Sequence, residues 1–309
     1  MSETNIFFQA QYLHDSTGFR WLIAFKLFAI KLFAESPIHS DDLQSALNIV
    51  SSWSSQWNLG LSETKCTVMY YGSNNPRIQY HINSIPLIPP PDKKMFVKDL
   101  GVLFSPSLTF SDHINKVISK ARSISNLMFK SFRSTSTLVY TKSFTTFILP
   151  HLEYGSIIWN PVHSVELTRS VEKVQRDFTR RLYARCKLPH VPYRQRLIDL
   201  NFMTLENRRV MIDLSFVHSI VHNRTLLDTS SLLCLSPLSR PLRNSHNLRI
   251  SLPFLPSNSQ TTVASRTISL WNSLPSTTVS SRSETFRLNI SSQPSSFFPV
   301  SIIKSWLDL

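Results

Sequence analysis

Glycine is scarce in this chain, with only five glycines among 309 residues. A phosphate-binding P-loop or a dinucleotide-binding turn needs several glycines within a few residues, because only a backbone without a Cβ approaches phosphates closely. The glycines stand far apart, at Gly18, Gly60, Gly72, Gly101 and Gly155. The sequence therefore excludes both nucleotide-binding motifs. It also lacks the Gly-x-Ser-x-Gly and His-Glu-x-x-His patterns of hydrolases and zinc proteases.

Cysteine is nearly as rare, and the three cysteines Cys66, Cys186 and Cys234 are widely separated. An odd number at such spacing builds neither a disulfide framework nor a Cys-x-x-Cys metal site. No histidine has ligand spacing beside a cysteine, so we expect no zinc site. The apolar stretch 21–34 holds two lysines and is too short to span a bilayer. We expect a soluble intracellular protein, in the cytoplasm or the nucleus, with no membrane partner.

Acidic residues are few: 33 lysines and arginines face 19 aspartates and glutamates, which gives a net charge of +14 and a pI near 10.0. Such a balance favours a polyanionic partner, because neutralising phosphates supplies most of the non-specific affinity for nucleic acid. The charge predicts RNA or DNA backbone as the partner, with no small-molecule substrate. The alternative is a solvated basic surface without a partner.

The residue pattern predicts an α+β fold whose strands lie in the first 110 residues. Residues 21–34 suit either a strand pair or a helix. A helix follows from Ser40-Asp-Asp, with a buried face of Leu43, Leu47, Val50, Trp53 and Trp57. We expect strands at Lys65–Tyr71 and, as a pair broken at Gly101, within Val97–Phe104. The proline cluster Ile85–Pro91 should exclude regular structure.

The remaining two thirds of the chain are predicted to be mainly helical. One apolar stripe comprises Ile114, Val117, Ile118, Ala121, Ile124, Leu127 and Met128. A second helix should run from Leu138 to Leu149 and stop at Pro150. A third buries Val171, Val174, Phe178 and Leu182. Serine and proline dominate from residue 228, with little regular pattern until Ala264–Leu274, which predicts a loosely structured tail.

The third of these helices is the most concentrated cationic segment. Against Glu172 and Asp177 it carries Arg169, Lys173, Arg176, Arg180, Arg181, Arg185 and Lys187. Phosphate contacts need only charge at the right spacing, so we predict that these seven residues bind nucleic acid. The alternative is a solvated outer face of a helical bundle. Arg208 and Arg209 suggest a smaller second patch.

Short motifs follow one another in a fixed order along the chain. They are Trp57-Asn-Leu-Gly-Leu-Ser-Glu-Thr-Lys-Cys66, Asp99-Leu-Gly-Val102, Leu108-Thr-Phe-Ser-Asp-His-Ile114, Lys120-Ala121, Leu149-Pro-His-Leu-Glu-Tyr154, Trp159-Asn-Pro161, Val171-Glu-Lys-Val-Gln-Arg176, Tyr193-Arg-Gln-Arg-Leu197, Leu205-Glu-Asn-Arg-Arg209 and Trp271-Asn-Ser-Leu-Pro275. In this order they resemble the C-terminal portion of the reverse transcriptases of non-LTR (LINE-like) retrotransposons. The resemblance implies the end of a polymerase palm, a thumb-like helical region and a C-terminal extension.

One element of that family is missing between Ala29 and Ile30. The segment Lys26-Leu-Phe-Ala-Ile-Lys-Leu-Phe-Ala-Glu-Ser36 resembles the catalytic strand–turn–strand without its two aspartates. Nucleotidyl transfer needs carboxylates that hold two magnesium ions. Asp41-Asp42 does not replace them, since it opens a helix, where capping is the expected role. We expect no catalytic residue and no cofactor here, although the intact family uses Mg²⁺.

The resemblance also implies two substrate-facing elements. Lys65 stands where the family has a lysine near the incoming nucleotide, and Leu100, Gly101 and Val102 occupy the primer-grip position. The alternatives are a surface lysine and a plain hairpin turn. The implied domains are an unassigned segment 1–20, a palm remnant 21–110, thumb-like helices 111–165, a basic helical region 166–227 and a Ser/Pro-rich extension 228–309.

Three functions remain open from the sequence. The first is a degenerate, truncated polymerase fragment with residual non-specific nucleic-acid binding. The second is an active RNA-directed DNA polymerase whose Asp-Asp turn was lost from an imperfect coding sequence. The third is a helical protein-interaction module. The oligomeric state is left open.

Overall fold

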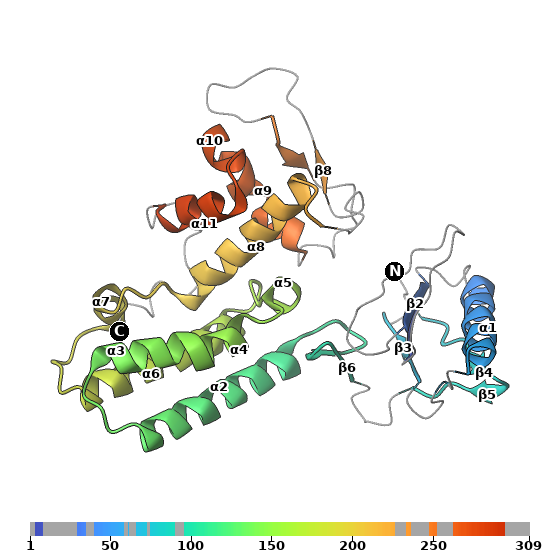
Figure 1. Cartoon of the computed structure of the whole chain (residues 1–309), viewed down its shortest axis with the longest axis horizontal. Coiled ribbons are helices and arrows are strands. Elements are labelled where there is room, and N and C mark those ends of the chain that lie inside the picture. The colour runs from blue at the N-terminus through green and yellow to red at the C-terminus, as the bar shows by residue number, and fades with distance from the viewer. Residues whose placement is uncertain are drawn as a thin grey trace. The chain divides into compact units, whose positions relative to one another are not determined.

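A computed structural model describes residues 4–8, 30–34, 40–58, 61, 66–72, 75–89, 96–225, 233–235, 247–251 and 262–293. The chain divides into two compact units, residues 1–113 and 114–309. The fold is α+β: short strands, almost all paired antiparallel, accompany one long helix in the first unit, and helices make up most of the second (Figure 1).

The first unit is built on a three-stranded sheet in the order β2-β1-β3. Its central strand β1 (Thr4–Phe8) pairs antiparallel with β2 (Ile30–Ala34) and β3 (Thr67–Tyr70). The first 20 residues gave no sequence signal, because a five-residue strand is too short to show a period. Residues 30–34 are a strand, so the helical alternative is wrong for them. Residues 21–29 lie outside the described part of the chain.

Helix α1 (Ser40–Gln56) covers the core of this unit. Leu43 and Leu47 pack into one buried cluster with Val68, Tyr70 and Ile82. Asp41 and Asp42 lie in its first turn, where their charge suits the helix dipole. The expected burial of Trp57 is wrong: its side chain is 63% exposed, because the helix ends one residue earlier and Asn58 turns the chain with a φ of 53°.

Two small hairpins complete the unit. β6 (Val97–Asp99) and β7 (Val102–Phe104) form the predicted pair, and both residues of their turn have positive φ (Leu100 44°, Gly101 93°). β4 (His81–Ile82) pairs with β5 (Ile85–Pro86), so the expectation that Ile85–Pro91 holds no regular structure is wrong at its start. A proline is tolerated there because this two-residue strand has a free edge.

The second unit begins with α2 (Ser111–Ser131), which buries Ile114, Ile118, Ala121 and Met128 as predicted. Leu127 is the exception, with 63% of its surface exposed. The buried row continues from Ala121 through Ser125 to Met128, and Leu127 lies about 100° away from Met128 around the helix.

The second predicted helix does not stop at Pro150. α3 (Thr137–Ser143) continues into a π-helical turn, η3 (Phe144–Ile148), and then into α4 (Leu149–Glu153). The Leu149 N–H donates to the Phe144 carbonyl five residues earlier. This wider turn accommodates the ring of Pro150 at the start of α4, which is a known local adjustment to proline. The short helix α5 (Ser156–Trp159) follows Gly155.

Three helices then build the central layer of this unit: α6 (Val165–Arg185), α7 (Tyr193–Asp199) and α8 (Leu205–Val221). The hydroxyls of Ser164 and Thr204 cap α6 and α8 by accepting from the N–H groups of Leu167 and Asn207. The predicted buried face of α6 is confirmed, since Val171, Val174, Phe178 and Leu182 are at most 2% exposed.

The expectation of a loosely structured tail is wrong for residues 262–293. They form α9 (Val263–Ser273), α10 (Ser276–Val279) and α11 (Ser283–Ser291), of which α9 and α11 pack against α8 (Figure 1). A short ladder joins β8 (Cys234–Leu235) to β9 (Ile250–Ser251). The shared core includes Leu214, Trp271 and Phe286. The regular pattern noted at Ala264–Leu274 coincides with α9, whereas the serine-rich composition gave no signal for α10 and α11.

No helix within the described residues is both long and apolar enough to cross a membrane.

Candidate nucleic-acid interface

Four basic residues of α6 follow one another on the same face of the helix. Arg169, Lys173, Arg176 and Arg180 are spaced by four, three and four residues. At a rise of about 1.5 Å per residue they span roughly 16 Å along the helix axis. The opposite face is anchored in the core by Val174 and Phe178, so the direction of this cationic row is fixed by packing.

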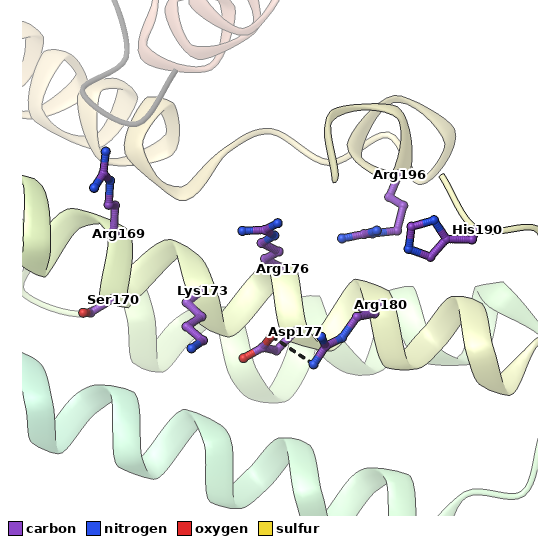
Figure 2. A pocket seen from close by; sticks show the side chains of 8 residues that line it. All are labelled: Arg169, Ser170, Lys173, Arg176, Asp177, Arg180, His190 and Arg196. Atoms are coloured by element: carbon purple, nitrogen blue, oxygen red, sulfur yellow. Dashed lines mark ion pairs between the residues drawn. The ribbon is translucent and has the colours of Figure 1, made fainter. Parts of the chain in front are cut away.

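These four residues line one wall of a pocket of about 450 Å³. We call it the α6 pocket; its lining comprises Arg169, Ser170, Lys173, Arg176, Asp177, Arg180, His190 and Arg196. Figure 2 shows Arg196 reaching from α7 toward the side of α6 that carries Arg176, with His190 beside it. Asp177 is the one carboxylate in this lining, and it lies 3.4 Å from Arg180. The pocket is therefore strongly cationic.

Arg196 is the most constrained cation of the α6 pocket, with only 5% of its surface exposed. Its Nε donates to Thr179 Oγ1 (3.3 Å) and its Nη1 to the Val191 carbonyl (2.7 Å). The guanidinium lies 5.5 Å from the ring centre of Tyr193. Burial lowers the pKa of Arg196, and the charge of nearby Arg176 lowers it further.

A buried guanidinium is normally neutralised by a carboxylate. Within the described residues none lies within ion-pair distance of Arg196. The groups that hold Arg196 in place are neutral, so they do not cancel the positive charge that it brings to the pocket wall.

The seven cations predicted to bind nucleic acid do not all lie in the α6 pocket. Arg181 and Arg185 turn toward α2 instead of the pocket. Arg181 donates to Asn126 Oδ1 (2.7 Å) and lies 4.2 Å over the Phe129 ring. Arg185 donates to the carbonyls of Phe129 (2.9 Å) and Phe132 (2.8 Å). These carbonyls lie at the C-terminal end of α2, where that of Phe132 also accepts from the Tyr140 hydroxyl (3.1 Å), so the two arginines link α6 to α2.

Lys187 lies beyond the end of α6, where it is exposed and has a φ of 56°. It is not part of the α6 pocket lining. Conversely, His190 and Arg196 were missing from the sequence prediction. Their signal is weak, because they come from the following loop and helix and meet α6 only through tertiary packing.

A buried carboxylate supports the pocket from within. Glu172 is fully buried and accepts hydrogen bonds from the Tyr193 hydroxyl (2.7 Å) and the Leu205 N–H (2.9 Å). Burial raises its pKa to about 7, against the lowering effect of the Tyr193 bond. Gln175 donates to the Tyr193 hydroxyl (3.1 Å) and to the Met203 carbonyl (3.0 Å). This network holds α7 and the start of α8 against α6.

A second buried network joins motifs that lie far apart in the sequence. Asn160 accepts from Arg209 Nε (3.0 Å) and donates to Asp213 (3.0 Å). Asp213 also receives two bonds from Arg266, at 2.7 and 2.8 Å, in a largely buried ion pair. Burial lowers the pKa of Arg209, and the nearby charge of Glu172 opposes that effect.

The predicted cationic patch at Arg208 and Arg209 is therefore wrong. Arg209 is 1% exposed and belongs to this internal network, and Arg208 forms an ion pair with Glu153. Charge alone could not distinguish a surface arginine from one that a buried acceptor holds inside the protein.

The elements predicted to face a nucleotide and a primer show little active-site geometry. Lys65 lies outside the described residues. Leu100 and Gly101 form a hairpin turn before Val102, and Leu100 is 48% exposed. The residues flanking the Ala29–Ile30 junction carry no carboxylate, so they do not fit a magnesium pair. In the part of the chain that the structure describes, no group of three or more metal-ligating side chains gathers.

An uncharacterised protein of Caenorhabditis elegans is 29% identical over 125 residues, which make up 40% of this chain and 63% of that protein. The chain thus spans 63% of the length of this relative. No family model matches the chain. No solved structure matches it either.

Proposed function

We propose that this chain is a degenerate relative of the LINE-like reverse transcriptases that binds RNA or DNA backbone through the α6 pocket and does not polymerise. The observation that carries the binding proposal is the convergence of Arg169, Lys173, Arg176 and Arg180 with Arg196 around one concave surface. The ordered sequence motifs support the evolutionary part.

The chemistry of the pocket favours phosphate over base. Its lining contains guanidinium, ammonium and imidazole groups but no Phe, Tyr or Trp ring on which a base could stack. Contacts to phosphate position a strand without reading its sequence. The row presents four cations over roughly 16 Å, so it can contact up to about four phosphates of a strand. Binding should therefore be independent of sequence and sensitive to salt.

The absence of polymerisation follows from the residues at Ala29 and Ile30. Without carboxylates there, nothing would hold two magnesium ions beside a primer end. Purified protein should incorporate no labelled nucleotide on a primed template with Mg²⁺ or Mn²⁺. Incorporation above that of a heat-denatured control would refute this part of the proposal.

Binding is tested by fluorescence anisotropy with a labelled 20-nucleotide RNA across a salt series. For about four single-strand phosphates, log K should fall with log salt at a slope of about −3. A triple variant, Arg169→Gln, Lys173→Gln and Arg180→Gln, should weaken binding and reduce the slope by about 2. Arg181 and Arg185 are left intact because they anchor α2.

A charge-matched variant provides the control. Lys116, Lys120 and Arg122 are exposed on α2 and lie outside the pocket lining, so replacing all three by glutamine removes the same charge. This variant should keep most of the salt slope. If both triple variants lost affinity equally, binding would depend on overall charge and the α6 pocket would not be the site.

A further inference from the structure

We infer that the α7 end of the α6 pocket, formed by Arg176, Arg180, His190 and Arg196, is a site for a terminal phosphate monoester. The inference rests on the proposed function and adds a ligand class to it. The chain would then prefer nucleic-acid strands that end in a phosphate over strands that end in a hydroxyl.

The first argument is the position of Arg196. Its side chain is almost fully buried in the pocket wall, and its Nε and Nη1 are already used by Thr179 and Val191. Within the described residues no group accepts a hydrogen bond from the remaining Nη2, and Arg196 lines the pocket. A recessed donor of this kind is reached by the end of a strand more easily than by a phosphate flanked by two sugars.

A second observation is the positive charge of two α6 arginines around that donor. Figure 2 shows Arg176 and His190 close to the Arg196 guanidinium, and Arg180 on the next turn of α6. Asp177 offsets part of the charge of Arg180. Even so, Arg176 and Arg180 bring positive charge close to the Arg196 guanidinium, and these charges would attract an anion that enters the pocket.

The third argument is charge matching. A phosphate monoester carries about −1.5 to −2 charge at neutral pH and three acceptor oxygens. An internal diester carries a single charge and has two free oxygens. Guanidinium groups bind such oxygens through short, charge-assisted and often bidentate bonds. Several convergent donors therefore suit the monoester better than the diester.

The test compares three 12-nucleotide strands of one sequence, which end in a 5′-phosphate, a 3′-phosphate or only hydroxyls. Competition anisotropy with the full chain should show at least about five-fold tighter binding of a phosphate-ended strand, as expected for one added charge-assisted bond. Millimolar inorganic phosphate, added as a competitor, distinguishes a site for the phosphate group alone from a site for a strand end. If inorganic phosphate abolishes the preference for phosphate-ended strands, the site binds the phosphate group alone. If the preference persists, the site binds the phosphate together with the end of the strand.

Three variants test which residues cause the preference for phosphate-ended strands. His190→Gln changes an exposed side chain and should reduce the ratio between phosphate-ended and hydroxyl-ended strands to less than two-fold. Arg196→Lys should do the same, and circular dichroism checks that this buried substitution still folds. Arg194→Gln, exposed on α7 and outside the pocket lining, should keep the full ratio.

Failure of the terminal-phosphate site and failure of the proposed function give different results in this experiment. Equal binding of all three strands with a normal salt slope would overturn the terminal-phosphate site and leave backbone binding intact. A hydroxyl-ended strand that does not bind, or binds without salt dependence, would instead contradict the proposed function itself. A ratio unchanged in His190→Gln and in folded Arg196→Lys would also overturn the inference.

Discussion

Glu172→Gln should stabilise the protein at neutral pH, although it removes a buried charge from a hydrogen-bonded network. Glu172 has a pKa of about 7 in the folded chain, against 4.5 for an ordinary glutamate. The folded state therefore binds the proton more tightly than the unfolded state does. The stability that this provides is fully present below pH 4.5 and is lost as the pH rises through 7.

The magnitude follows from the two pKa values. A change from 4.5 to about 7 corresponds to about 3 kcal/mol. The amide of the variant resembles the protonated acid: its oxygen can accept from the Leu205 N–H, and its NH₂ can donate to the Tyr193 hydroxyl. The variant should match the wild type near pH 4.5 and exceed its free energy of unfolding by up to about 3 kcal/mol at pH 8.

Urea unfolding at pH 5, 6, 7 and 8 measures this difference, with fluorescence of the buried Trp159 and Trp271 as the signal. Taking the difference between variant and wild type removes contributions from all other titrating groups. Glu166→Gln, an exposed acid in the first turn of the same helix, is the control and should show no such pH-dependent gain. A difference that stays constant with pH, or one that grows toward low pH, would refute the reasoning.

Three further outcomes follow from the structure. Arg185→Gln should lower the free energy of unfolding by about 1–2 kcal/mol, because two carbonyls of α2 lose a charged donor; an unchanged urea midpoint would contradict that role. Asp213→Asn should lower the free energy of unfolding by about 3–5 kcal/mol, since it leaves Arg266 buried without a full charge partner. Amide hydrogen exchange in α8 and α9 should then be faster than in the wild type. Burial lowers the pKa of His218 to about 4, so its contribution to stability is present above pH 6.5 and is lost as pH falls toward 4. An NMR titration of the His218 imidazole with a midpoint above 6 would contradict this lowered pKa.

Periodic features of the fold could be predicted from sequence. The buried face of α6 was predictable because Val171, Val174, Phe178 and Leu182 repeat at helical spacing. The β6–β7 hairpin was predictable from β-forming residues around a glycine. β1 and the helices α10 and α11 were not, because their stability comes from partners distant in sequence.

The candidate site was predictable only in part, and arginine shows why. Arg176 and Arg181 belong to the same basic helix, yet one lines the pocket and the other lies over Phe129. The difference depends on which helix packs on which side, and charge patterns carry no such information. Glu172 was counted as an acidic counterweight in a basic segment, whereas it is an internal acceptor for Tyr193 and Leu205.

Photocrosslinking shows which residues contact nucleic acid, because it locates the bound strand without altering the protein. A 4-thiouridine RNA bound at low salt is irradiated, and the crosslinked peptides are identified by mass spectrometry. The account predicts crosslinks within residues 165–196, where α6 and α7 form the pocket, and their loss at high salt. Crosslinks confined to residues 1–113, or spread evenly over the chain, would contradict it.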